Sequence, residues 1–148
     1  MFKKALAVFA IGMAAMAGSS FANDDPVATR QNLMKSVGLA TGTLGKMVKG
    51  ELPYDPITAE LAMRVIFTSA VGYVDLFPEG SGEGANTEAS PKIWEDKAGF
   101  DAVALKLEQS ALAAIPASKE GLDSLKANFG SVAQNCRACH ENYRVKKN

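Results

Sequence analysis

The stretch of this sequence with the clearest chemistry is Cys136-Arg137-Ala138-Cys139-His140, which ends eight residues before the C-terminus. Two thiols three positions apart can each add to a vinyl group of one haem, and the histidine that follows is placed to ligate its iron. The chain has 2 cysteines and 1 histidine, all within this stretch. The spacing therefore predicts one covalent haem c, attached through Cys136 and Cys139, with His140 as an axial ligand.

Three other roles for these residues are less consistent with the sequence. A structural zinc site needs four ligands, and the stretch supplies at most three. A thioredoxin-type redox pair follows a strand, and no strand pattern precedes Cys136. A disulfide between cysteines three apart on a helix has poor geometry, because bridged Cα atoms prefer a separation of about 5.5 Å with suitably directed Cβ atoms. The residues favour covalent haem.

The N-terminus has the pattern of a secretory signal peptide. Lys3 and Lys4 precede an apolar run over residues 5–17, and Ser20-Phe21-Ala22 ends it with small residues where a signal peptidase cuts. The run is shorter than the roughly 20 residues that span a membrane. We therefore expect residues 1–22 to be removed, leaving no membrane anchor. Because haem is attached to such thiols outside the cytoplasm, we expect the protein in a bacterial periplasm.

The charge balance argues against nucleic acid as a partner. The chain has 16 basic and 16 acidic residues, and removal of Lys3 and Lys4 leaves a net charge of about −2. Nucleic-acid-binding proteins need a concentrated excess of Lys and Arg. The one basic cluster lies near the C-terminus, where it either stabilises a helix end or acts around the haem edge: Arg137, Arg144, Lys146 and Lys147.

Apolar residues recur at steps of three and four in four segments, each bounded by proline, glycine or capping residues. We expect helices from Asp25 or Thr29 to about Lys49, from Pro56 to Phe77, from Pro91 to Ile115, and from Ser118 through the haem motif. Residues 78–89 lack periodicity and predict an exposed loop. Short connectors favour antiparallel neighbours, so residues 23–148 predict a single all-α domain, an antiparallel four-helix bundle with up-down-up-down order.

The last predicted helix has a regular apolar stripe that includes both thiols. His140 lies four positions after Cys136 and shares its face. The stripe therefore places the thiols on the buried side of the helix: Leu122, Leu125, Phe129, Val132, Cys136, Cys139 and Tyr143.

Three glycines interrupt the first predicted helix, at positions 38, 42 and 45. Each costs an isolated helix up to about 1 kcal/mol relative to alanine. Close approach of another helix or of a flat cofactor would offset this cost.

The mature sequence resembles the cytochrome c′ family of class II cytochromes c along most of its length. The C-terminal motif is followed by an aromatic residue and an arginine, Tyr143 and Arg144, as in that family. Further matching stretches are Arg30-Gln31 before Met34, Lys49-Gly50, Pro53-Tyr54-Asp55, Leu76-Phe77-Pro78 and Pro91-Lys92-Ile93-Trp94.

The resemblance implies a haem near one end of the bundle, with His140 as the ligand on its solvent side and Met34 over the opposite, distal face. In typical members the distal face has no ligand, so the iron is five-coordinate, high-spin and able to bind nitric oxide or carbon monoxide. The resemblance also places Arg144 beside the axial histidine and Arg30 near a haem propionate. Many members are homodimers built on the first two helices.

Met34 decides between two functions. If the Met34 thioether ligates the iron, the protein is a low-spin electron carrier. If Met34 is only a flexible core residue, the iron stays open to a gas. We expect Met34 not to coordinate, in a protein that binds gases and undergoes a one-electron redox change with a partner that the sequence does not identify. The distal side is expected to be apolar, lined by Met34 and by Leu33, Val37, Val74 and Phe77.

The sequence argues against an enzyme. A peroxidase-type site needs an acid-base residue over the iron, and the chain has no second histidine. On the proximal side we expect Tyr143 to pack near the haem and Arg144 to influence the charge balance of the iron.

Overall fold

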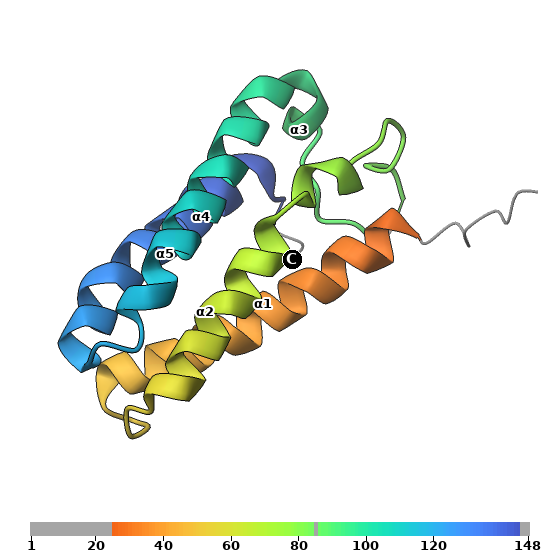
Figure 1. Ribbon diagram of the computed structural model, residues 1–148. Coiled ribbons are helices and arrows are strands. Elements are labelled where there is room, and N and C mark those ends of the chain that lie inside the picture. The colour runs from red at the N-terminus through yellow and green to blue at the C-terminus, as the bar shows by residue number, and fades with distance from the viewer. Residues whose placement is uncertain (1–24, 85, 146–148) are drawn as a thin grey trace, which may run out of the picture.

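The computed structural model describes residues 25–84 and 86–145 (Figure 1). The predicted signal peptide, and Lys146 and Lys147 of the basic cluster, lie outside the described residues. Within these ranges, no helix is both long and apolar enough to cross a membrane.

Four long helices form the predicted up-down-up-down bundle (Figure 1). The elements in chain order are α1 (Pro26–Lys49), α2 (Pro56–Ala70), the 3₁₀ helix η1 (Tyr73–Leu76), the short α3 (Lys92–Glu95), α4 (Lys97–Ala117) and α5 (Leu122–Tyr143). The helix α1 packs closely on α2, and α4 packs on both α2 and α5, whereas α1 and α5 touch over a shorter stretch. This leaves room between α1 and α5.

The first two helices begin with the aspartate-proline pair that the sequence shows. The Asp25 side chain accepts a hydrogen bond from the Val27 amide at 2.8 Å, and Asp55 accepts one from the Thr58 amide at 2.7 Å. Each aspartate thus satisfies an amide that lacks a partner within the helix. Gly50, at φ 78°, ends α1 in the left-handed conformation that glycine adopts most readily.

Three predicted helix boundaries are wrong because apolar spacing continues through breaks in the backbone. The helix α2 ends at Ala70 rather than Phe77, since Val71 is extended and Gly72 has φ 68°. The third segment is interrupted at Asp96, whose side chain caps α4 by accepting from the Gly99 amide at 3.1 Å. The helix α5 begins after Gly121, at φ 135°, not at Ser118.

The glycines of α1 lack the close helix neighbour that would offset their cost. A Cβ atom built on Gly38, Gly42 or Gly45 would have no atom of another element within 4 Å. Packing of a neighbouring helix against them is therefore not the explanation. Gly38 lies on the wall of the cavity described below, so a cofactor remains the candidate there.

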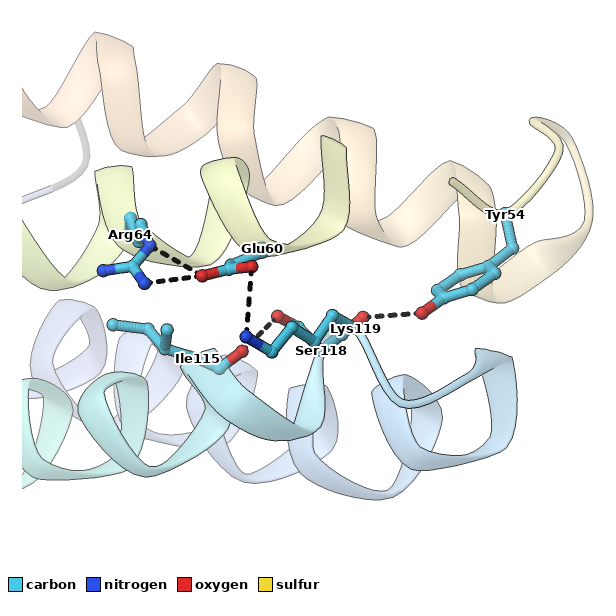
Figure 2. Close-up of polar contacts among 6 residues, drawn as sticks. All are labelled: Tyr54, Glu60, Arg64, Ile115, Ser118 and Lys119. Carbon is cyan, nitrogen blue, oxygen red and sulfur yellow. Dashed lines mark hydrogen bonds and ion pairs between the residues drawn. The ribbon is translucent and has the colours of Figure 1, made fainter. Parts of the chain in front are cut away.

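The end of the bundle at the α1–α2 connection is held by polar contacts (Figure 2). The Tyr54 hydroxyl donates to the Ser118 carbonyl at 2.9 Å and accepts from the Gly121 amide at 3.1 Å. Glu60 of α2 accepts from Arg64 and forms an ion pair with Lys119 at 3.6 Å. These contacts join the α1–α2 connection and the start of α2 to the α4–α5 connection.

An aromatic cluster lies toward the opposite end. Phe77 and Phe100 are in edge contact with ring centroids 4.9 Å apart, and Phe100 contacts Tyr143 at 5.3 Å in the same way. The Tyr143 hydroxyl donates to Asp96 at 2.8 Å. This cluster ties η1, α4 and the end of α5 together and forms one wall of the cavity.

Candidate functional site

A cavity of about 670 Å³ opens between α1 and α5, at the end of the bundle with the aromatic cluster. Its volume lies within the range of roughly 300–1,000 Å³ that is usual for ligand and cofactor sites. Most of its wall is apolar. Its lining includes Met34, Val37, Thr41, Ile66, Ala70, Tyr73, Phe77, Phe100, Leu107, Cys136, Cys139, His140 and Tyr143, together with the polar residues Arg30, Gln31, Lys35, Thr87, Glu88 and Arg144.

The two thiols and the imidazole lie on the α5 side of this cavity, as their spacing predicts. Cys136 and Cys139 are free and partly buried. Burial raises the pKa of Cys136, and burial together with the neighbouring Cys136 raises the pKa of Cys139 to about 11. Burial also lowers the pKa of His140. Both thiols are therefore protonated at neutral pH, and the imidazole favours the neutral form that binds metals.

The α1 side of the cavity carries the residues expected on the distal face. Met34, Val37 and Phe77 all contribute to the wall. Leu33 and Val74 do not line it, so their predicted place there is wrong. Sequence reasoning also missed Thr41, although Thr41 lies two turns after Met34 on the same face of α1.

Sequence reasoning also missed the residues of α2 and α4 that line the cavity, for a different reason. Ile66 and Ala70 of α2 and Leu107 of α4 line the cavity. Apolar spacing identified them as inward-facing residues of their helices. It did not show the rotation of each helix relative to α1, and this rotation decides which inward residues reach the cavity.

Arg30 is buried, with only 4% of its surface exposed. Its Nη1 donates to the Leu76 carbonyl at 3.1 Å and to Ser81 Oγ at 3.0 Å. Its Nη2 donates to the Ser81 carbonyl at 2.7 Å and to Thr87 Oγ1 at 2.6 Å. The guanidinium also lies 4.6 Å from the Phe77 ring centroid. Arg30 thus lines the cavity while holding the segment after η1, and its proximity to a propionate stays a prediction.

We call residues 81–84 and 86–90 the strap, because this segment crosses from α1 to the end of α5. It contacts the end of α5 and the residues that follow through two backbone hydrogen bonds: the Ser90 amide donates to the Tyr143 carbonyl at 3.0 Å, and the Val145 amide donates to the Glu88 carbonyl at 2.9 Å. The expectation of an exposed loop holds at Glu83, Gly84 and Asn86 and is wrong at Thr87, which is buried.

Arg144 follows α5 rather than belonging to it. The helix ends at Tyr143, and Arg144 is extended, at φ −122° and ψ 131°. Its Nε and Nη2 both lie 2.5 Å from Oε2 of Glu88 in the strap. Both residues line the cavity. Sequence reasoning missed Glu88, because no spacing signal connects a loop residue to one 56 positions later.

The residues present fit a flat, largely apolar cofactor that is attached by thiols. Two cysteines and one histidine share a wall of a large apolar cavity. The cavity wall also contains Thr41 Oγ1, which has no hydrogen-bond partner and is the one such buried side-chain atom among residues 25–84 and 86–145.

A model of the family described as Cytochrome C' matches residues 25–144, which is almost all of the described chain. The chain belongs to the cytochrome c′ family. Cytochrome c′ of Rhodopseudomonas palustris (strain ATCC BAA-98 / CGA009) is 40% identical over 130 residues, covering 88% of this chain and 88% of that protein. Cytochrome c-556 of Agrobacterium tumefaciens (strain apple 185) is 40% identical over 119 residues, covering 78% of this chain and 90% of that protein.

Solved structures of cytochrome c′ have the same fold. That of Rhodopseudomonas palustris superimposes with a TM-score of 0.79 at 40% identity, over 84% of this chain and 98% of that one. A nitric oxide complex of a cytochrome c′ variant from Alcaligenes xylosoxidans has a TM-score of 0.74 at 32% identity, over 83% of this chain and 95% of that one. Membership of this family makes one covalent haem c the cofactor, and the two cysteines fit it.

Proposed function

We propose that this protein binds nitric oxide or carbon monoxide at a five-coordinate haem c and undergoes a one-electron redox change. In this proposal Cys136 and Cys139 hold the haem, and His140 is the axial ligand. The haem supplies an iron that takes a small gas molecule or one electron. The observation that carries the proposal is the placement of both thiols and the imidazole on one side of the cavity, with the apolar side chains of Met34 and Val37 on the α1 side.

The α1 side of the cavity supports a role in binding rather than in catalysis. Val37 is buried in the main apolar core, against which Met34 packs, and Phe77 is buried in the aromatic cluster. None of these side chains transfers a proton, which peroxidase chemistry requires. Arg30, Gln31 and Lys35 also line the cavity from α1, so the apolar part of this wall is the place for a small uncharged gas. That the protein is not an enzyme remains a prediction.

The alternative is a low-spin electron carrier in which Met34 ligates the iron. Met34 is on the cavity wall, as this alternative requires. The solved nitric oxide complexes of related cytochromes c′ favour the gas-binding function instead.

An optical spectrum of the haem-loaded protein separates the two functions. We expect broad high-spin bands in the oxidised and reduced protein, and a strong change of the Soret band when carbon monoxide is added to the reduced protein. Sharp α and β bands that do not respond to carbon monoxide would contradict the proposal. Met34→Ala would then identify or exclude that side chain as the sixth ligand.

We also propose that the protein is exported to the periplasm and cleaved after Ala22. This rests on the signal-peptide pattern of residues 1–22 and on the thiol attachment of haem, which takes place outside the cytoplasm. The mass of the exported protein tests it: we expect a chain that begins at Asn23 and carries one haem. An intact N-terminus at Met1 would contradict it.

The proposed homodimer uses the outer faces of α1 and α2. A shallow groove between these helices is lined by exposed apolar residues, among them Leu39 at 77% and Leu61 at 57% exposure. Covering such residues would remove a sizeable apolar area from water. Sedimentation should show a dimer that Leu61→Glu dissociates. Leu112→Glu is the matched control, since Leu112 is similarly exposed on α4, and it should leave the dimer intact.

A further inference from the structure

The direction of the Arg144 side chain is set by the strap and not by α5. Arg144 is extended and forms an isolated antiparallel bridge with Ala89. The hydrogen bonds from Ser90 to Tyr143 and from Val145 to Glu88 flank this bridge. Spacing along the helix would place Arg144 one turn beyond His140. The pairing with the strap instead fixes where its side chain begins and which residue it faces.

The Glu88 side chain adds an ion pair to this backbone pairing between the strap and Arg144. Its Oε2 lies 2.5 Å from both Nε and Nη2 of Arg144. The two side chains are 40% and 50% exposed, so the pair contributes little to the free energy of unfolding. Two hydrogen bonds to one planar guanidinium nevertheless restrict its orientation. The ion pair therefore fixes the position of the Arg144 guanidinium more than it stabilises the fold.

The strap is also anchored on its other side. Arg30 of α1 donates to Thr87 Oγ1 at 2.6 Å, and the same oxygen accepts from the Ala89 amide at 3.1 Å. Glu88 thus lies between a residue held by α1 and a residue paired with the end of α5. The hydrogen bonds of its two neighbours fix the Glu88 backbone, and this allows the Glu88 carboxylate to orient another side chain.

The pair lies on the same cavity wall as the imidazole of the haem motif. Glu88, Arg144 and His140 all line this cavity. The pair consists of one cation and one anion, joined between the residue after α5 and the strap. The charge near His140 therefore depends on where the Arg144 guanidinium is held.

We propose that Glu88 is a positioning residue that holds the Arg144 guanidinium beside His140 and thereby sets the local charge that influences one-electron reduction of the haem. This rests on the proposed function, in which His140 is the axial ligand. Reduction adds one negative charge to the haem site. A cation that is fixed nearby favours this step more than one that moves freely, because the freely moving charge spends part of its time farther from the haem site.

A double-mutant cycle on the haem-loaded protein tests the proposal. The reduction equilibrium is measured by potentiometric titration for the wild type, Glu88→Ala, Arg144→Gln and the double variant. With Glu88 present, we expect Arg144→Gln to lower the equilibrium constant for reduction by about two- to five-fold, the range for a partly exposed charge pair. In the Glu88→Ala background the same substitution should have less than half of this effect on a logarithmic scale.

An effect of Arg144→Gln that is equal in both backgrounds, or absent in both, would overturn the proposal. Glu60→Gln is the control, because it removes a paired carboxylate at the other end of the bundle and should leave the reduction equilibrium unchanged. A second readout needs no redox chemistry. The Arg144 Nε–H proton should exchange slowly in the wild type and faster in Glu88→Ala, while Arg64 Nε–H, bonded to Glu60 at 3.0 Å, should be unaffected.

The two proposals fail in different ways. If the proposed function is wrong, the reduced wild type will not respond to carbon monoxide. If only the role of Glu88 is wrong, that response will be normal, and Arg144 Nε–H will exchange at the same rate with and without the Glu88 carboxylate.

Discussion

Replacing Arg30 by methionine tests how much one buried arginine contributes to the wall of the haem cavity. Methionine keeps an unbranched apolar side chain but removes all four hydrogen bonds from the two Nη atoms to Leu76, Ser81 and Thr87. The exposed Arg64 provides a matched control. It pairs with Glu60 one turn away on the surface of α2, so Arg64→Met removes a guanidinium from a solvated site.

The structure sets the expected magnitudes. The bond to Thr87 is fully buried, and its loss costs about 1.5–3 kcal/mol because the donor is charged. The other three bonds are partly buried, so water replaces part of each. Removing Arg30 also relieves the desolvation that lowers its pKa in the folded protein. The net loss in the free energy of unfolding should be about 2–4 kcal/mol, against about 0.5 kcal/mol for Arg64→Met.

The assay is denaturant unfolding of both haem-loaded variants, together with hydrogen exchange of the Ser90 and Val145 amides. These amides pair the strap with the end of α5. We expect both to exchange faster in Arg30→Met and at the wild-type rate in Arg64→Met. Equal stability losses in the two variants, or unchanged exchange in Arg30→Met, would refute the conclusion that Arg30 holds the strap.

Three further predictions follow from single residues. Gly42→Ala should raise the free energy of unfolding by about 0.5–1 kcal/mol, because no other element lies near Gly42. Gly50→Ala should lower the free energy of unfolding by about 1 kcal/mol, because Gly50 has φ 78°. Thermal unfolding measures both changes. In the folded haem-free protein, alkylation of Cys139 should be slow at pH 8, because only the thiolate reacts. The rate should increase as the pH rises toward the Cys139 pKa of about 11. Equal alkylation rates in folded and unfolded chains would contradict this prediction. Met34→Ala should speed carbon monoxide binding by opening the wall opposite His140, and an unchanged stopped-flow rate would show that Met34 does not crowd the site.

The bundle could be predicted because its signals are local. Asp25 and Asp55 cap their helices with side chains that reach only two or three residues along the chain. The breaks were harder to predict. Apolar spacing runs through Gly72 and Asp96, and only the structure shows the left-handed backbone at Gly72 and the side-chain cap at Asp96 that break the helices there.

The haem motif could be read directly from the order of its residues, because one helix fixes the relative positions of Cys136, Cys139 and His140 within little more than one turn. The contacts around His140, unlike the motif itself, join residues that are far apart in the sequence. Arg30 meets Thr87, and Arg144 meets Glu88, across 57 and 56 residues of sequence, through a segment that has no periodicity. Local spacing carries no information on such contacts. They form only when the bundle brings α1, the strap and the end of α5 together, so the tertiary structure alone determines what Arg30 and Arg144 contact near the haem motif.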